Sequence, residues 1–506
     1  MNPQTALQFL VEGRTEAAAE LCSRLLRDHP EDPGANHVQG LVLLQTGKAG
    51  ESIPFLEKAA AGIPGDAHFR YNLGLALQKA GRTAEAVSVY EALVSIFPDF
   101  FEAIDNLGTL HHALGESGRA AALHERALRL RPDHPGALCN LGLALQEMGD
   151  PEGAISCFSR ALARHPQNPE ALNNLGLALQ ETGRFQEAVA FFLEALKSRP
   201  DYPRAKFNLS LLLLLLGRYE EGFELYESRF EGAKELSGCG REYRVLPSWK
   251  GEALDGRKIL VWTEQGLGDA LMMLRFLPMM KGEVSVACGP ELGRLIGAFP
   301  GVAPDGRDVP EGDFQIPLMS LPRLFGTRID SIPRQTPYLH VPEPMIREWA
   351  EKLSGRDGMK VGLVWAGSPK LRADSLRSLP FSKLAPFLAI PSVRFFSLQK
   401  GPAAGEGQGV EDRMGECSDF LDTAALVANL DLVIGVDTSV IHLAGALGKP
   451  VWLLNRHGSE WRWMLDREDS PWYPTMRIFR QRSPGDWDEV ISRAAAELRK
   501  LSSTPA

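Results

Sequence analysis

The sequence predicts a helical solenoid over its first half, followed by two α/β lobes. Two observations lead to this fold class. A pattern of Asn, Gly and Pro recurs every 34 residues up to about residue 232, and beyond residue 257 short β-branched runs alternate with helical stretches. A chain of 506 residues is also too long for one hydrophobic core, so several domains are expected.

The repeat is clearest in the segment NLGLALQ, which begins at residue 72 and returns at residues 140 and 174. Its glycine, Gly142 for example, leaves room where two helices approach closely. A second glycine, such as Gly149, ends the first helix of a unit, and a proline closes the unit because it cannot continue a helix. These positions resemble the tetratricopeptide repeat over about residues 1–232. The resemblance implies an α-solenoid (TPR superhelix) with a concave groove.

One asparagine recurs at a fixed position of the first helix in successive units. The members of this asparagine ladder are Asn72, Asn106, Asn140, Asn174 and Asn208. A carboxamide donates and accepts hydrogen bonds, so a row of them can hold the backbone of an extended peptide. A similar ladder holds substrate protein in the O-GlcNAc transferases, and the overall layout is similar, which implies peptide binding in the groove. Alternatively, the asparagines stabilise the array itself.

The rest of the chain has the pattern of a doubly wound α/β architecture. A polar connector is expected at residues 233–256, a first lobe at 257–345 and a second lobe at 346–506. In the first lobe the expected strands are KILVWTE, EVSVAC and FQIPL. In the second lobe they lie in KVGLVWAGSP, in RFFSLQKG and on both sides of a short helix after residue 439. A linker helix within 340–358 and a last helix at 487–501 complete the prediction.

The first candidate site is the segment EQGLGDALMM, which follows the first strand of the first lobe. Gly266 and Gly268 form an open turn, and Asp269 follows in the first turn of a helix. A dinucleotide fingerprint would need a third glycine where Leu271 stands, which argues against a nicotinamide enzyme. A carboxylate at this place can take the proton of an acceptor hydroxyl. The alternative is that Asp269 only complements the helix dipole.

The second candidate site is the strand-to-helix turn in GVDTSVIHLAG. Asp437, Thr438 and Ser439 stand at the turn, and His442 lies one helical turn further on. Hydroxyls and free N–H groups at a helix start are suited to hold a diphosphate, and a histidine can donate to its oxygens. The alternative is ordinary helix capping beside a packed core histidine.

These two segments, EQGLGDALMMLRFLP and GVDTSVIHLAGALGKPVWLL, resemble the signature segments of glycosyltransferase family 9, the ADP-heptose:lipopolysaccharide heptosyltransferases. The resemblance covers about residues 255–500 and implies a GT-B fold of two Rossmann-like domains. It further implies a nucleotide-sugar donor, with Asp269 as the general base and Asp437 on the sugar rather than the phosphate. The segment WAGSPKLRADSLRSLPFSKLAPFL matches its form in bacterial proteins that fuse tetratricopeptide repeats to such a domain.

A third segment supplies positive charge for the leaving diphosphate. Gly367 and Ser368 end a strand, and Lys370 and Arg377 follow. The family uses a lysine downstream of this strand, but either residue can offset the charge that develops on the diphosphate. Gln399, after the next strand, is also expected to contact the nucleotide sugar. The aromatic segments SEWRWML and SPWYP either stack on the donor or fill a packed seam.

Composition narrows the possible partners. The net charge of −9 falls within residues 1–232, because residues 233–506 carry equal numbers of acidic and basic side chains. Neither half has the basic face of a nucleic-acid binder. The six cysteines lack paired spacing, which disfavours a disulfide framework or a zinc site. No metal or other cofactor is expected, because the acids of Asp486-Trp487-Asp488 stand where helix caps are expected.

The location and the oligomeric state are less defined. The first residues lack the basic and apolar regions of a signal peptide, and the longest apolar run is too short to cross a bilayer. A cytoplasmic protein is therefore expected, while its oligomeric state stays open.

Together these features predict an inverting, metal-independent glycosyltransferase that moves a sugar from a nucleotide sugar to a Ser or Thr hydroxyl of a protein recruited by the repeats. A first alternative keeps the enzyme but makes the acceptor a lipopolysaccharide or another glycan, with the repeats as an assembly module. A second alternative is a non-catalytic scaffold.

Overall fold

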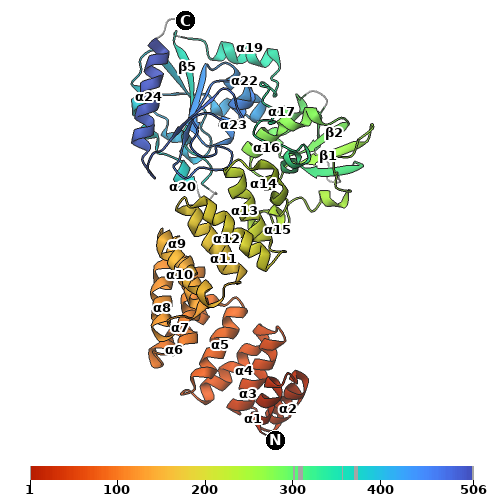
Figure 1. Cartoon of the computed structure of the whole chain (residues 1–506), viewed down its shortest axis with the longest axis vertical. Helices are drawn as coiled ribbons and strands as arrows, with labels where there is room; N and C mark the ends of the chain where they lie inside the picture. The colour runs from red at the N-terminus through yellow and green to blue at the C-terminus, as the bar shows by residue number, and fades with distance from the viewer. Residues whose placement is uncertain (1, 300–301, 306–311, 356, 370–373, 504–506) are drawn as a thin grey trace. The chain divides into compact units, whose positions relative to one another are not determined.

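The computed structural model describes residues 2–299, 302–305, 312–355, 357–369 and 374–503. The chain divides into two compact units, Met1–Pro200 and Asp201–Ala506. The predicted fold class is confirmed, since helical repeats are followed by two parallel sheets with helices around them (Figure 1). The boundary between the units falls inside the repeat pattern, because the last helical pair of that pattern belongs to the second unit.

The first unit consists of consecutive helical hairpins, each with a short helix A and a helix B packed on it. Its helices are α1 (Pro3–Val11), α2 (Thr15–Asp28), α3 (Pro33–Gln45), α4 (Ala49–Gly62), α5 (Ala67–Lys79), α6 (Thr83–Ile96), α7 (Phe101–Ala113), α8 (Ser117–Leu130), α9 (Pro135–Glu147), α10 (Pro151–Arg164), α11 (Pro169–Glu181) and α12 (Phe185–Ser198). Prolines begin several of them, where the missing N–H group has no helical partner to lose.

The two glycines of each repeat have the roles that the sequence predicts. A Cβ at residue 142 in α9 would lie 2.6 Å from Cε1 of Phe158, a fully buried side chain of α10. Gly149, at the turn between these helices, has φ of +82°, a conformation that L side chains rarely adopt. One glycine therefore sets the distance between the helices and the other sets the turn.

The second unit begins with α13 (Pro203–Leu215), α14 (Tyr219–Tyr226) and the short α15 (Arg229–Gly232). The first lobe follows, and its described strands form a parallel sheet in the order β3-β2-β1-β4. The strands are β1 (Lys258–Trp262), β2 (Glu283–Ala287), β3 (Val302–Asp305) and β4 (Phe314–Pro317), and the helices are α16 (Leu267–Met273), α17 (Pro290–Gly297) and α18 (Leu321–Leu324).

The second lobe is a parallel sheet in the order β10-β9-β8-β5-β6-β7. Its strands are β5 (Met359–Val364), β6 (Val393–Ser397), β7 (Glu411–Asp412), β8 (Leu432–Val436), β9 (Val451–Asn455) and β10 (Met476–Arg480). Its helices are α19 (Glu343–Lys352), α20 (Asp374–Arg377), α21 (Ala385–Leu388), α22 (Phe420–Ala428), α23 (Ser439–Ala446) and α24 (Trp487–Ser503). The sequence pattern does not predict β3, β7 or β10.

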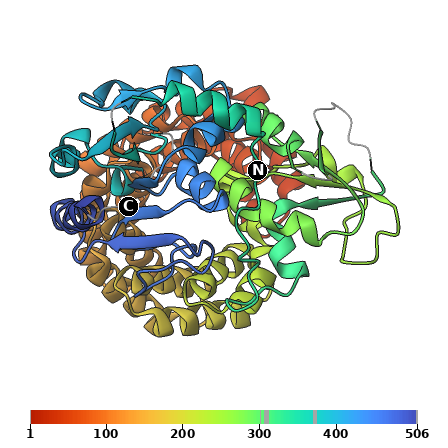
Figure 2. The ribbon, with the colours of Figure 1, turned by 90° about the horizontal axis from the view of Figure 1, so that it is seen from above.

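The lobes of the second unit meet along α16 and α23, which lie side by side between the two sheets (Figure 1, Figure 2). Buried Arg275, after α16, also joins them, since its guanidinium donates to Tyr338 Oη at 3.1 Å and to the carbonyl of Trp472 in the second lobe. The C-terminal end of α16 is thereby held against the second lobe.

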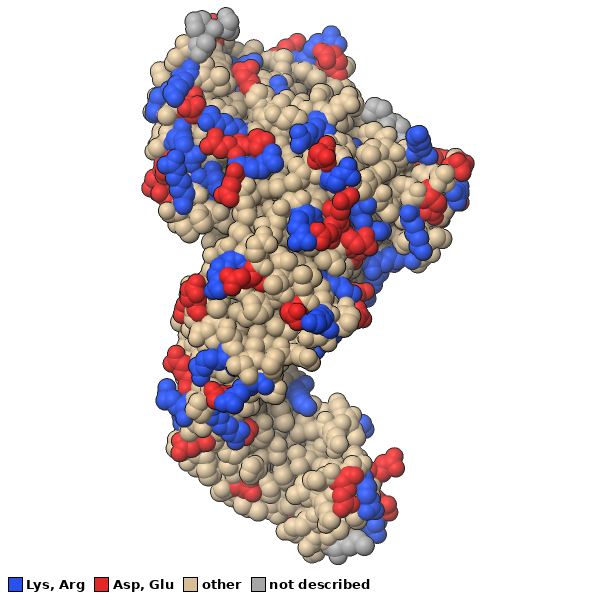
Figure 3. Space-filling view, viewed as in Figure 1, with Lys and Arg blue, Asp and Glu red and all other residues tan. Residues whose placement is uncertain are grey.

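Lysine and arginine are interspersed with aspartate and glutamate on the face of the molecule that Figure 3 shows. Mixed charge of this kind does not create the continuous positive field that attracts nucleic acid. Among the residues that the structure describes, no helix has both the length and the apolar character that a membrane span requires.

Replacing Gly142 by alanine tests the close approach of α9 and α10. Because the new Cβ would overlap the buried Phe158 ring, Gly142→Ala should lower the free energy of unfolding of the first unit by about 1–3 kcal/mol, although alanine favours helix. Urea denaturation followed by circular dichroism measures this. Gly118→Ala in α8 is the matched control, because nothing lies within 4 Å of its added Cβ. Equal stability of both variants would contradict the packing argument.

Candidate active site between the two lobes

The two predicted turns meet across the lobes at one place. A Cβ at residue 268 would lie 2.7 Å from Cδ2 of His442 and 3.5 Å from Cα of Ser439. Gly268 therefore allows the start of α16 to touch the start of α23. Asp269 is the next residue, so the carboxylate predicted as a base and the helix start predicted for the diphosphate lie at the same junction.

Asp269 forms an ion pair across the lobes with Arg462. The guanidinium donates to Oδ1 through Nε at 2.8 Å and through Nη2, and its Nη1 donates to Oε2 of Glu460 at 2.8 Å. Burial alone would lower the pKa of Arg462, but the charges of Asp269 and Glu460 outweigh it and raise that pKa. Within the described part of the chain, Oδ2 of Asp269 accepts no hydrogen bond.

Asp437 lies at the end of β8 beside a buried histidine. Oδ1 of Asp437 is 3.8 Å from Nε2 of His442, whose Nδ1 is 2.9 Å from Oη of Tyr473. Burial alone would raise the pKa of Asp437, but His442 and the charge of Arg462 outweigh it and lower that pKa to about 2. His442 is only 3% exposed and its ring packs against Trp463, so it is a packed side chain of the junction in this state.

Thr438 occupies the N-cap position of α23. Its side chain makes no capping hydrogen bond, and among the described residues its buried Oγ1 has no partner. A buried hydroxyl without a partner is costly unless a ligand or water satisfies it. Ser439 follows as the first residue of α23, beside the N–H groups that have no helical acceptor.

The third predicted segment forms a small polar cluster. The N–H of Gly367 donates to Oγ of Ser378 at 2.9 Å, and that hydroxyl donates to Oδ2 of Asp374 at 3.0 Å. Arg377 Nε donates to Oδ1 of the same aspartate at 3.0 Å, so its charge is partly balanced. Ser368 is exposed. Lys370, the other cation predicted for the diphosphate, lies outside the described residues.

Gln399 holds two strand ends together. Its Oε1 accepts from the N–H groups of Trp365 and Ala366 at 3.1 and 2.9 Å, and its Nε2 donates to the carbonyls of Ala366 and Lys400 at 3.0 and 2.8 Å. The side chain is 2% exposed. The backbone thus occupies both donor positions and both acceptor positions of the amide, which leaves none for a nucleotide sugar.

The aromatic segments pack against α14 as a seam. Trp472 stacks on Tyr219 with ring centroids 5.8 Å apart, and Trp461 meets Phe223 edge to face at 5.8 Å. Both tryptophans are almost fully buried. Of the two interpretations of these residues, the packed seam describes their contacts in this state.

A buried ion pair joins α15 to the first lobe. Arg229 Nη2 donates to Oε1 of Glu264 at 2.9 Å, and the N–H of Met319 donates to the same oxygen at 3.2 Å. Among the described residues, Oε2 of Glu264 has no hydrogen-bond partner. Burial raises the pKa of Glu264 to about 7, although the charge of Arg229 acts in the opposite direction.

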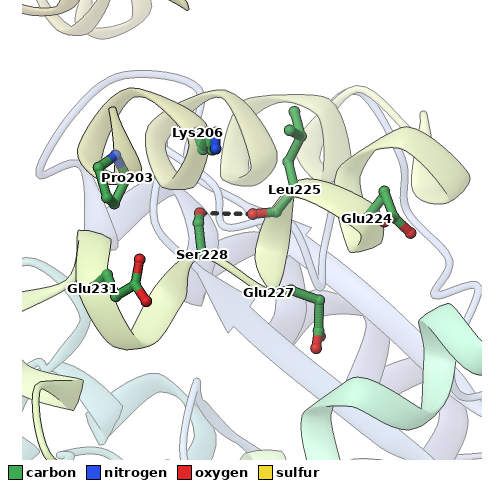
Figure 4. Close-up of a pocket in the computed structure, with 7 residues that line it drawn as sticks. All are labelled: Pro203, Lys206, Glu224, Leu225, Glu227, Ser228 and Glu231. Carbon is green, nitrogen blue, oxygen red and sulfur yellow. Dashed lines mark hydrogen bonds between the residues drawn. The ribbon is translucent and has the colours of Figure 1, made fainter. Parts of the chain in front are cut away.

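A pocket of about 320 Å³ lies near the α15 end of this ion pair (Figure 4). The residues that line it are Pro203, Lys206, Glu224, Leu225, Glu227, Ser228 and Glu231. Ser228 donates to the carbonyl of Leu225 at 2.7 Å. None of the lining residues is a predicted site residue. Among the described residues, no group of three or more His, Cys, Asp or Glu side chains is placed to hold a metal ion.

The asparagine ladder makes hydrogen bonds within the array. Nδ2 of Asn106 donates to Oη of Tyr71 at 3.3 Å, Nδ2 of Asn140 donates to Oγ1 of Thr109 at 3.3 Å, and Nδ2 of Asn72 is 2.8 Å from Nε2 of His37. Each partner named here belongs to the preceding repeat. Asn174 accepts from Asn173 at 3.2 Å, and Asn208 lies in α13 of the second unit. All five side chains are partly exposed, so they support the array and also face solvent.

Sequence reasoning missed Arg462, Asp374 and Ser378. A signal for Arg462 was present, because a cation between Trp461 and Trp463 in a buried segment requires a carboxylate partner. Its partner is 193 residues away in the chain, so no local pattern could identify it.

The role of Gln399 can be tested by its replacement with leucine. Because the buried backbone groups would lose their partners, Gln399→Leu should lower the free energy of unfolding by about 2–4 kcal/mol. Thermal and urea denaturation measure it, and the exposed Gln408→Leu is the control. Unchanged stability together with weaker nucleotide-sugar binding would instead make Gln399 a ligand contact.

The buried Glu264 predicts a pH dependence of stability. Its folded-state pKa of about 7 lies above the ordinary value of 4.5 for a glutamate, so the folded state holds this proton to higher pH than the unfolded chain. Its contribution is fully present below about pH 4.5 and is lost as the pH rises through 7, by at most about 1.4 kcal/mol per pH unit. In Glu264→Gln this decline should be absent. Unfolding free energies measured over that range compare the two proteins, and parallel curves would contradict the assignment.

Comparisons with known proteins agree with this architecture. Tetratricopeptide-repeat models match residues 5–67, 43–109, 99–167, 139–203 and 181–230. The model of glycosyltransferase family 9 (heptosyltransferase) matches residues 418–483. That match contains the turn at Asp437 and also Arg462, whereas Asp269 in the first lobe lies outside it.

Among curated proteins, Protein FlbA of Caulobacter vibrioides is 33% identical over 326 residues, which cover 56% of this chain and 53% of FlbA. The chain thus spans about half the length of this relative. Among solved structures, the Cut9–Hcn1 hetero-tetramer of the APC/C is 18% identical with a TM-score of 0.39, covering 46% of each chain. Pseudomonas aeruginosa PilF is 19% identical with a TM-score of 0.36, covering 40% of this chain and 91% of PilF.

The sheet order, the helix starts that meet between the lobes and the matched segments lead to one description: the chain joins tetratricopeptide repeats to a glycosyltransferase domain of the GT-B type, which resembles glycosyltransferase family 9 over residues 418–483.

Proposed function

We propose that the protein is an inverting glycosyltransferase that uses a nucleotide sugar as donor and a Ser or Thr hydroxyl of a protein as acceptor. The observation that carries the proposal is the junction at Gly268, where the helix start with Asp269 touches the helix start with Thr438 and Ser439. A base for the acceptor and a cradle for the donor are needed at one place, because the acceptor oxygen and the sugar carbon must come within bonding reach.

The step follows from these groups. Oδ2 of Asp269 takes the proton of the acceptor hydroxyl, and the acceptor oxygen forms a bond to the anomeric carbon of the sugar. The bond from that carbon to the diphosphate breaks, and the nucleoside diphosphate leaves with the electron pair. Attack from the face opposite to the leaving group inverts the anomeric configuration.

The charges at the junction favour this placement of the diphosphate and the sugar. The diphosphate would occupy the start of α23, where the partnerless Thr438 hydroxyl and the free N–H groups of the helix supply donors. Asp437, held ionised by its low pKa, would face the sugar hydroxyls, since two anions repel. Arg377 and Lys370 remain the cations proposed for the developing charge of the diphosphate.

A protein acceptor is supported by the repeat array. Its asparagine ladder is partly exposed, and a solenoid offers an extended surface for a polypeptide that is too long for the junction alone. We place acceptor recognition on that ladder and transfer at the junction.

The test is transfer from a panel of nucleotide sugars, with cell lysate as a source of acceptors. Asp269→Asn keeps the size of the side chain and an oxygen for Arg462 but removes the base, so kcat should fall by about 10²–10⁴-fold. Thr438→Val should raise the dissociation constant for the donor by about tenfold, because a buried donor to the diphosphate is lost. Asp488→Asn, on the surface of α24, is the control.

Released nucleotide and added mass on polypeptides are the two measurements. If the added sugar appears only on glycan or lipid, the acceptor is a lipopolysaccharide or another glycan and not a protein. Failure of every donor to bind, or full activity of Asp269→Asn, would overturn the enzymatic proposal and leave a scaffold.

A further inference from the structure

The turn that leads into α16 and Asp269 is held by α14, which lies outside the two lobes. Gln265 Nε2, in the turn before α16, donates to Oη of Tyr226 at 2.7 Å. One residue earlier in the same loop, Glu264 pairs with Arg229 of α15. Helices α14 and α15 therefore both contact the segment that leads into the proposed base.

The same tyrosine also contacts the segment of Arg462. The Tyr226 ring meets Trp461 edge to face with centroids 6.5 Å apart, and the guanidinium of Arg462 lies 4.7 Å above the Trp461 ring. Tyr226 thus touches the segments on both sides of the Asp269–Arg462 ion pair, which come from different lobes.

The Tyr226 hydroxyl is neutral at this position. Burial raises its pKa to about 12, with the charge of Asp269 acting in the same direction and those of Arg462 and Arg229 acting against it. A neutral phenol that accepts from Gln265 orients the loop by hydrogen-bond geometry and packing rather than by charge.

We infer that Tyr226 is a positioning residue for the transfer step, which sets the place of the Asp269 carboxylate through Gln265 and that of its Arg462 partner through Trp461. The inference rests on the proposed function. It makes the last helical pair a part of the catalytic unit, in agreement with the division of the chain before Asp201. Misplacement of a reacting group by about 1 Å can cost a hundredfold in rate, so a single hydrogen bond at this distance from the base has a measurable effect.

A matched control, Tyr219, stands about two helical turns earlier on α14. Tyr219 is equally buried and its ring stacks on Trp472, but among the described residues its hydroxyl makes no hydrogen bond to the segment that leads into Asp269. Tyr219→Phe therefore removes a phenol oxygen from the same helix without breaking a hydrogen bond to that segment, whereas Tyr226→Phe breaks the bond to Gln265 and keeps the ring.

The experiment measures kcat and KM for the donor in the full chain, together with the thermal midpoint. Tyr226→Phe should lower kcat roughly tenfold with the donor KM unchanged, and Tyr219→Phe should match the unaltered protein. Gln265→Leu should lower kcat to a similar extent. The double variant Tyr226→Phe/Gln265→Leu should be no slower than either single variant, because both remove one hydrogen bond.

The outcomes separate this inference from the proposed function. If the unaltered protein transfers sugar and depends on Asp269 while Tyr226→Phe behaves like Tyr219→Phe, the positioning role is overturned alone. Multiplicative losses in the double variant, or a higher donor KM with unchanged kcat, also overturn it. If the unaltered protein transfers no sugar, the proposed function fails and the positioning role falls with it.

Discussion

The close contact between α16 and α23 is the constraint on which the second unit depends. Two parallel sheets can each present a helix start, but only a residue without a side chain lets the two starts touch, and Gly268 supplies it against His442. Once the helices are this near, Arg462 reaches Asp269 from the other lobe and the charges of both are balanced. The polar chemistry of the junction is thus a consequence of packing.

Most of the fold could be predicted from the sequence because its signals are local. The 34-residue spacing defines the hairpins, and the glycines that set helix distance and turn, such as Gly142 and Gly149, act on near neighbours in the chain. Apolar runs such as KILVW identify the central strands. The strand β10, MRIFR, carries two arginines among three apolar residues, and β7 is two exposed acids, so neither has the composition of a buried strand.

The candidate site could be predicted only in part. Turns that follow strands identified Asp269 and Thr438, since the carboxyl ends of parallel strands are where α/β proteins bind ligands. The partners of these residues could not be found in the same way, because Arg462 and Asp269 are brought together by the docking of lobes and not by any spacing. For Gln399 the local pattern could not reveal its partners either: a polar residue after a strand is a candidate ligand contact, and in the structure its amide bonds to the backbone of two strand ends.

The division before Asp201 has a consequence for how such a chain can diverge. In a solenoid each hairpin contacts mainly its neighbours, so whole hairpins can be gained or lost at little cost to the rest. The six hairpins of α1–α12 are free to change in number in this way, whereas α13–α15 are tied to the lobes by Arg229 and the aromatic seam. Selection can therefore lengthen or shorten the array, and with it the extent of its groove, while the final hairpin is inherited together with the lobes.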